Sequence, residues 1–105
     1  MAGAPAPALK KATEAAGIKI SDLSQVKTHN PFIVNDINTS KQLNIDQKII
    51  NNYGSSMVYG HPQAPTAGRA IIELIEALAI QGGGYGAFTG CAAGDIAASM
   101  VIKVD

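Results

Sequence analysis

The sequence predicts an α/β fold in which helices cover the faces of a β-sheet with mixed strand directions. The clearest helix spans residues 66–81, where apolar side chains recur every three or four positions and charged side chains lie on the other side. After the glycine run Gly82–Gly84, residues 85–89 fit a strand, and residues 96–104 alternate in the way typical of a closing strand. Strands separated by helices, followed by a closing pair of strands, indicate an α/β layer.

The N-terminal part of the chain predicts a helix, a short strand and a second helix. Residues 5–16 are rich in Ala and Lys, carry proline in the first turn and are followed by Gly17, a typical helix C-cap. Residues 25–29 fit a short strand that ends before an Asn-Pro pair. Residues 31–41 fit a second helix, and the polar residues 42–52 fit a loop with some helix.

Residues 55–59 are predicted to form another strand, shortly before the helix at residues 66–81. Because that helix leads into the strand at residues 85–89, the three segments would form a strand–helix–strand unit. The ends of its two strands would bring His61 and Cys91 together, although the two residues are far apart in the sequence. We therefore expect one site that contains an imidazole and a thiol.

Composition argues against several classes of function. The 105 residues are enough for one small domain, the net charge is zero, and Lys10-Lys11 is the longest basic run, so no nucleic-acid partner is expected. The apolar run at residues 70–80 contains two glutamates and is too short to span a bilayer, so no membrane partner is expected. A single cysteine without a visible signal peptide indicates a cytoplasmic protein.

The scarcity of large side chains bears on how the core is completed. The chain has two Phe, three Tyr and no Trp, whereas Gly and Ala are abundant. Such a core needs close packing of backbone on backbone, or a partner that completes it. Small domains also bury a smaller share of their surface. Both points favour a part of a larger assembly over a free-standing module.

His61 lies between Gly60 and Pro62, directly before a predicted helix. The proline restrains His61 to extended backbone geometry, and the glycine allows a ligand to approach closely. The helix N-terminus offers free N–H groups and a partial positive charge, which suit an oxyanion or a thiolate. The alternative is a histidine at a turn that merely bonds the backbone.

Cys91 lies among small residues, Gly90, Ala92, Ala93 and Gly94. These neighbours leave room for a substrate and expose backbone amides. A thiol near an imidazole can exchange protons at neutral pH. The alternative is a buried structural cysteine, which is the commoner fate of a lone Cys. The pairing with His61 favours the chemical interpretation.

The segment His29-Asn30-Pro31-Phe32 follows the short strand predicted at residues 25–29. His29 could place a water or a carbonyl through a ring nitrogen, and Asn30 could bond nearby backbone. The alternative is a turn built on Asn-Pro chemistry. Asp95 is interpreted as structural.

Other reaction classes lack their motifs. Two histidines and one cysteine without close spacing do not predict a zinc site. The glycine-rich segment Gly82–Gly86 follows a helix and precedes a strand, whereas a phosphate-binding loop needs the reverse order. No Gly-x-Ser-x-Gly elbow is present.

Together these motifs resemble the C-terminal domain of thiolases, the acyl-CoA acyltransferases that cleave or form 3-oxoacyl-CoA. Gly60-His61-Pro62 resembles the Gly-His-Pro of the family, and Cys91 falls where the family carries its second active-site cysteine. Gly3–Ala8 and Thr66–Arg69 resemble two further elements, so the likeness covers nearly the whole chain. His29–Phe32 matches the site of the Asn-Glu-Ala-Phe motif and lies nearer the His-Asp-Cys-Phe version of the sterol-carrier and archaeal-like branch.

The resemblance implies a thiolase-like half-fold, one of two similar halves of a five-layer arrangement, and a role for each matching residue. His61 would activate a nucleophilic cysteine and help to bind a thioester oxygen. Cys91 would move the proton at the α-carbon of the acyl-CoA, and His29 would take the place of an asparagine that positions a water. The remaining pocket residues implied are Gly60, Pro62, Asn30, Phe32, Ala93 and Gly94. Coenzyme A enters as substrate, with no bound cofactor and no metal.

The chain departs from the family pattern in several places. Ala93 stands where Cys-x-Gly places its glycine, Tyr53-Gly54-Ser55 stands for Asn-Gly-Gly, and Ala64 stands where glycine is usual. These changes bear on substrate choice.

The largest departure is the absence of the cysteine that forms the acyl-enzyme. The family forms its acyl-enzyme on a cysteine of the N-terminal domain, and the single cysteine here matches the second role. Residues 1–105 are therefore expected to act with an N-terminal half, as a fragment of a longer protein or as a subunit of a homo- or hetero-oligomer. The alternative function is a non-catalytic acyl-CoA-binding or assembly module. A ketoacyl synthase fits less well, because those enzymes usually pair the nucleophile with two histidines, or with a histidine and an asparagine, instead of a second cysteine.

Overall fold

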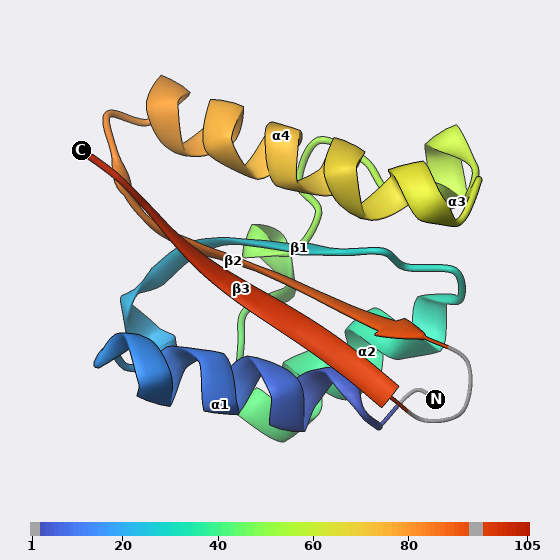
Figure 1. The fold of residues 1–105 in the computed structure, drawn as a ribbon, viewed down its shortest axis with the longest axis horizontal. Helices are drawn as coiled ribbons and strands as arrows, with labels where there is room; N and C mark the ends of the chain where they lie inside the picture. Colours follow the sequence, from blue (N-terminus) through green and yellow to red (C-terminus); the bar gives the residue numbers. More distant parts are fainter. Residues whose placement is uncertain (1–2, 93–95) are drawn as a thin grey trace.

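A computed structural model describes residues 3–92 and 96–105 and arranges them in three layers (Figure 1). A three-stranded sheet lies in the middle, the long helix α4 covers one face, and α1 and α2 lie on the other. The elements in chain order are α1 (Pro5–Ala16), the 3₁₀ helix η1 (Ile20–Asp22), β1 (Leu23–Thr28), α2 (Ile33–Leu43), the 3₁₀ helix η2 (Gln47–Ile49), α3 (Ser56–Tyr59), α4 (Ala64–Ile80), β2 (Gly84–Ala92) and β3 (Ile96–Val104). Within these described ranges, no helix is long and apolar enough to cross a membrane.

The strand order β1-β2-β3 places β2 in the centre of the sheet. β1 runs parallel to β2, and β3 runs antiparallel to β2, which confirms the predicted mixed sheet. The pairing of Thr28 with Thr89 brings the ends of the two parallel strands to one edge. The residues that follow each strand therefore meet at this edge, although they are far apart in the sequence.

Two apolar clusters hold the layers together. The cluster between the sheet and the N-terminal helices consists of Leu9, Leu23, Val26, Ile45, Ile50 and Ala87. The second cluster, under α4, consists of Ala70, Leu74, Leu78 and Phe88. α4 packs directly on the backbone of β2 there, because a Cβ built on Gly86 would lie 2.6 Å from Leu74 Cδ1 and 2.9 Å from Leu78 Cδ1. The few large side chains are thus compensated by close backbone packing.

Most predicted elements are confirmed, with shifted ends. The helix predicted at residues 5–16 is α1, and it ends at Gly17 in the left-handed conformation, with φ 73°. The predicted helix at residues 66–81 is α4, which begins two residues earlier and carries proline in its first turn. The weakly patterned helix predicted at residues 31–41 begins at Ile33 and ends at Leu43, where Asn44 adopts a left-handed conformation as C-cap.

The strand predicted at residues 55–59 is wrong. The segment forms the single-turn helix α3, because the Ser55 side chain accepts a hydrogen bond from the backbone N–H of Met57 and caps the turn. Gly54 and Gly60, with φ of 106° and 87°, end the segment on both sides in a conformation that interrupts a strand. The strand that pairs in parallel with β2 is therefore β1, and the predicted strand–helix–strand unit does not form.

Candidate active site

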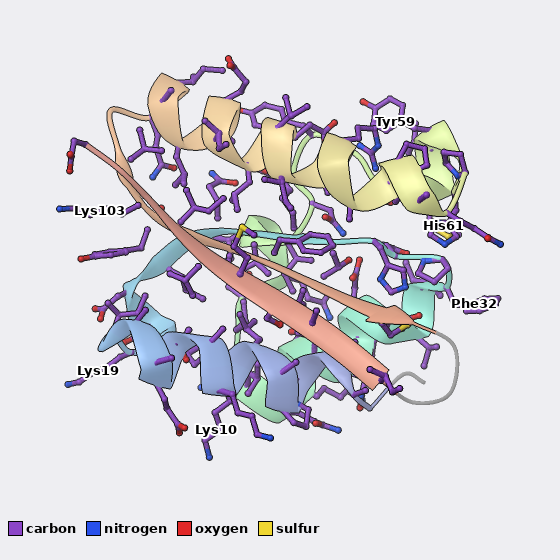
Figure 2. All side chains as sticks on the ribbon, in the orientation of Figure 1. Lys10, Lys19, Phe32, Tyr59, His61 and Lys103 are labelled. Atoms are coloured by element: carbon purple, nitrogen blue, oxygen red, sulfur yellow. The ribbon has the colours of Figure 1, made fainter. Side chains whose placement is uncertain are left out.

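An open cavity of about 640 Å³ lies at the edge where the parallel strands β1 and β2 end. Its walls come from four segments: the residues after β1, the turn before α4 with the first part of that helix, the last part of β2, and the first part of β3. Ligands in open α/β sheets commonly bind beyond the carboxyl ends of parallel strands. Figure 2 shows His61 and Phe32 together at this end of the molecule.

Cys91 and His29 are in direct contact in the wall of this cavity. Cys91 Sγ lies 3.0 Å from His29 Nε2, and 62 positions separate the two residues in the sequence. Cys91 is partly exposed, whereas His29 is only 6% exposed. Gly90 makes room for the Phe88 ring beside this pair, since a Cβ there would lie 2.9 Å from Phe88 Cζ, whereas it would only touch His29 Nδ1 at 3.5 Å. The sheet therefore joins a thiol and an imidazole by pairing β1 with β2.

His61 also lines the cavity, and its ring lies next to the ring of His29. Its ring centroid is 5.5 Å from that of His29, in an edge-on arrangement with an interplanar angle of 68°. Its Nδ1 lies 3.1 Å from the hydroxyl of Thr66, a buried residue in the first turn of α4. The Thr66 contact fixes the ring, and His61 itself is exposed. The imidazole at the mouth of the cavity is thus accessible, and the imidazole next to the thiol is enclosed.

The electrostatic environment keeps His29 neutral at physiological pH. Burial lowers the pKa of His29 below its ordinary value of 6.5, and the charge of a protonated His61 lowers it further. Among the described residues, His29 Nδ1 has no hydrogen-bond partner. A neutral imidazole can accept a proton at one nitrogen and donate one at the other, which suits proton exchange with Cys91.

This environment predicts how His29 titrates. In an NMR titration of the histidine rings, we expect the midpoint of His29 to lie below 6.5, and His61→Ala to move it upward without reaching 6.5, because burial remains. Because the unfolded chain then binds more protons than the native chain, the stabilising contribution of His29 is complete above about pH 6.5 and is lost as the pH falls toward the native midpoint. A midpoint at or above 6.5 would contradict the enclosed position of the ring.

The other predicted pocket residues are placed differently. Phe32 lines the cavity and is 55% exposed. Asn30 is buried behind the wall, where its amide donates to Asp36. Gly60 and Pro62 are exposed in the turn between α3 and α4, outside the cavity wall. Ala93 and Gly94, together with Asp95, lie outside the described residues.

Sequence reasoning missed two polar residues next to the histidines. The sequence pattern marks Thr66 only as part of a motif, although a polar side chain in the first turn of a helix, five positions after His61, is a signal for a partner of that ring. Asp36 gave no signal beyond being the only acidic residue in the first turn of α2. Among the described residues, no group of three or more His, Cys, Asp or Glu side chains could hold a metal ion.

Comparison with known proteins decides the family. Residues 1–104 match the family model of the thiolase C-terminal domain. The chain belongs to the thiolase family. The 3-ketoacyl-CoA thiolases of Aliivibrio fischeri strain ES114 and Erwinia tasmaniensis are 34% and 33% identical to it, each over 96% of this chain. The matches cover 27% of each relative, so this thiolase domain spans about a quarter of the length of the curated relatives it matches.

Solved structures agree with the assignment to the thiolase fold. The Bacillus anthracis acetyl-CoA acetyltransferase superimposes with a TM-score of 0.92 at 27% identity, over 97% of this chain and 26% of that one. A thiolase from Ascaris suum in complex with coenzyme A gives a TM-score of 0.91 at 26% identity, over 97% and 26% of the two chains. The human mitochondrial 3-ketoacyl-CoA thiolase in complex with CoA gives 0.94 at 24% identity, over 99% and 26%, which supports the fold alone.

Proposed function

We propose that this chain is the C-terminal half of an acyl-CoA C-acyltransferase that catalyses thiolysis or Claisen condensation of 3-oxoacyl-CoA. The observation that carries the proposal is the contact between Cys91 Sγ and His29 Nε2 in the wall of an open cavity, with His61 at its mouth. Family membership and the names of the relatives, 3-ketoacyl-CoA thiolases and an acetyl-CoA acetyltransferase, support the reaction class.

The reaction needs a base next to a thioester. In the condensing direction, Cys91 as thiolate removes a proton from the α-carbon of an acyl-CoA. The resulting carbanion attacks an acyl group held as a thioester on a cysteine of the other half, so a C–C bond forms and the C–S bond to that cysteine breaks. In thiolysis the same steps run backward, and Cys91 returns the proton. A base whose proton affinity is tuned to neutral pH is the usual requirement for this type of catalysis.

The two histidines would divide the remaining work. His61, exposed at the cavity mouth, would accept the proton of the nucleophilic cysteine and donate to a thioester oxygen. His29 is buried against Cys91, and its neutral ring would donate to the thiolate or to a water at the developing oxyanion. Donors that are already in position when charge develops give large rate accelerations.

Further features of the whole protein belong to the same proposal. The substrates would be coenzyme A and acyl-CoA, as the structure of the Ascaris suum thiolase in complex with coenzyme A suggests. The partner would be a cysteine-bearing N-terminal half, within a homo- or hetero-oligomer in the cytoplasm, acting in lipid metabolism. The His29–Phe32 segment favours the sterol-carrier and archaeal-like branch.

Complementation tests this proposal directly. The chain would be expressed with and without the cysteine-bearing half supplied by its upstream or neighbouring coding sequence, and thiolysis of acetoacetyl-CoA would be measured. We expect the chain alone to be inactive and the assembled enzyme to be active, because one cysteine cannot serve as both nucleophile and base. We expect His61→Ala in the assembled enzyme to lower the rate by about 10²–10⁴-fold.

Lys10→Ala, an exposed substitution on α1, should leave the activity unchanged. A stable complex that binds CoA but shows no turnover on short or aromatic 3-oxoacyl-CoAs would reject the catalytic proposal. It would instead support the acyl-CoA-binding or assembly module.

A further inference from the structure

A partly buried polar cluster lies next to His29 and involves both of its neighbours in the chain. Its centre is the carboxylate of Asp36 in the first turn of α2. Asp36 Oδ1 accepts a hydrogen bond from the Thr28 hydroxyl at 2.5 Å, and Oδ2 accepts from the side-chain amides of Asn30 and of Asn51, the latter at 3.1 Å. Thr28 and Asn30 are the two neighbours of His29 in the chain, so one carboxylate holds the residues on both sides of the ring.

Asn51 closes the cluster into a network. Its amide nitrogen donates to the Thr28 hydroxyl at 2.8 Å, and its amide oxygen accepts from the Thr28 backbone N–H at 2.9 Å. The Thr28 hydroxyl must then direct its own proton to Asp36, because it already accepts from Asn51. All three neighbours of the carboxylate are therefore donors, and the ionised form of Asp36 is the form that accepts from them.

The same cluster sets an uncommon backbone conformation next to His29. Asn30 has φ 42°, in the left-handed region, and is 3% exposed. The hydrogen bond from the Asn30 side-chain amide to Asp36 stabilises this conformation. The His29 carbonyl accepts a hydrogen bond from the hydroxyl of Ser56 in α3. The backbone on either side of His29 is thus held by side-chain hydrogen bonds, and its direction sets where the ring meets Cys91.

We infer that Asp36 is a positioning residue that holds His29 Nε2 against Cys91 Sγ through Thr28 and Asn30. The catalytic meaning of this role rests on the proposed function, in which Cys91 is the proton-transfer group. An amide at this position can accept at one atom only and presents N–H groups to a neighbouring donor. Asp36→Asn therefore releases Asn30 or Thr28 while keeping the size of the side chain.

A purely structural role makes a different prediction. An acidic residue in the first turn of a helix stabilises it through the helix dipole. Under that role, Asp36→Asn would reduce the stability of the chain but would leave the chemistry of Cys91 unchanged. The decisive quantity is therefore the reactivity of Cys91 in the folded protein, and the stability of the chain is measured only as a check.

The experiment measures the alkylation rate of Cys91 by iodoacetamide at pH 7 in the full chain, alone and assembled with the cysteine-bearing half, with peptide mass spectrometry to identify the modified residue. We expect Asp36→Asn to lower this rate about fivefold to tenfold, the effect of losing one well-placed hydrogen bond. In a His29→Gln background the same substitution should have no further effect, because Asp36 acts through His29. Asp46→Asn makes the same chemical change at the N-cap of η2, where the amide oxygen can still accept from the Lys48 backbone N–H, and it should leave the rate unchanged.

Several outcomes decide between the two roles. Equal alkylation rates in folded Asp36→Asn and the parent chain, or additive effects of Asp36→Asn and His29→Gln, would overturn the inference. If Asp36→Asn fails to fold, Asn30→Gly replaces it, because glycine accepts the left-handed backbone but lacks the bond to Asp36. If the two substitutions have non-additive effects on the alkylation rate but the assembled enzyme shows no turnover, the proposed function is rejected and the positioning role is kept. If the assembled enzyme turns over but the two effects are additive, the positioning role is rejected and the proposed function is kept.

Discussion

Cys91→Ala in the assembled enzyme should lower the rate of thiolysis and of condensation by about 10²–10⁴-fold, the usual contribution of a general acid–base group. The sulfur lies in the cavity wall 3.0 Å from His29 Nε2, and no second cysteine exists in the chain to replace it. Cys91→Ser should be nearly as inactive, because an alcohol does not ionise at neutral pH. The measurement is steady-state thiolysis of acetoacetyl-CoA with CoA as the second substrate.

The control for this substitution removes one polar atom elsewhere. Ser21→Ala changes an exposed side chain in η1 and should retain full turnover. Formation of the acyl-enzyme on the other half should survive Cys91→Ala, since that step uses His61 and the nucleophilic cysteine of that half. Turnover of Cys91→Ala within a few-fold of the parent would show that the base is another group.

Leu74→Ala should reduce the free energy of unfolding of the chain by about 2–5 kcal/mol, the range for truncating a buried leucine. Leu74 is fully buried in the cluster under α4 and rests on the backbone of β2 at Gly86. The backbone is fixed by pairing on both sides, so it cannot move to fill the cavity left by the missing methyl groups. Urea unfolding followed by circular dichroism measures the loss.

Ile72→Ala provides the matched control in the same helix. Ile72 is 64% exposed, so its truncation should change the free energy of unfolding by no more than about 0.5 kcal/mol. Equal losses of unfolding free energy for Leu74→Ala and Ile72→Ala would mean that the Leu74 face of α4 does not pack against the sheet as described. That result would contradict the described packing.

Local patterns were sufficient for most of the fold. The helix at residues 66–81 could be predicted because its apolar side chains repeat with the helical period and the face against the sheet is nearly all aliphatic. The strand predicted at residues 55–59 failed because the apolar run of Met57, Val58 and Tyr59 fits either structure. The Ser55 cap and the positive φ of Gly60 decided in favour of a helical turn.

The candidate site could be predicted only in part. Its residue types follow from the motifs, but the contact between His29 and Cys91 depends on parallel pairing of β1 with β2, which no local pattern encodes. The cluster around Asp36 was unpredictable for a similar reason, because Asn30 and Asn51 reach the carboxylate from left-handed backbone positions in separate loops. The predicted roles of Ala93 and Gly94 stay predictions, since both lie outside the described residues.

The central strand of the sheet is synthesised long after the strand with which it pairs in parallel. β1 ends at Thr28 and β2 begins at Gly84, so the edge of β1 that pairs with β2 stays unpaired until the intervening chain has been made. Long-range pairing of this kind carries a loop-closure cost and is slow compared with helix formation. The thiol and its imidazole therefore meet only after β2 has been made and has paired with β1, and until then this edge of β1 is open to other strands.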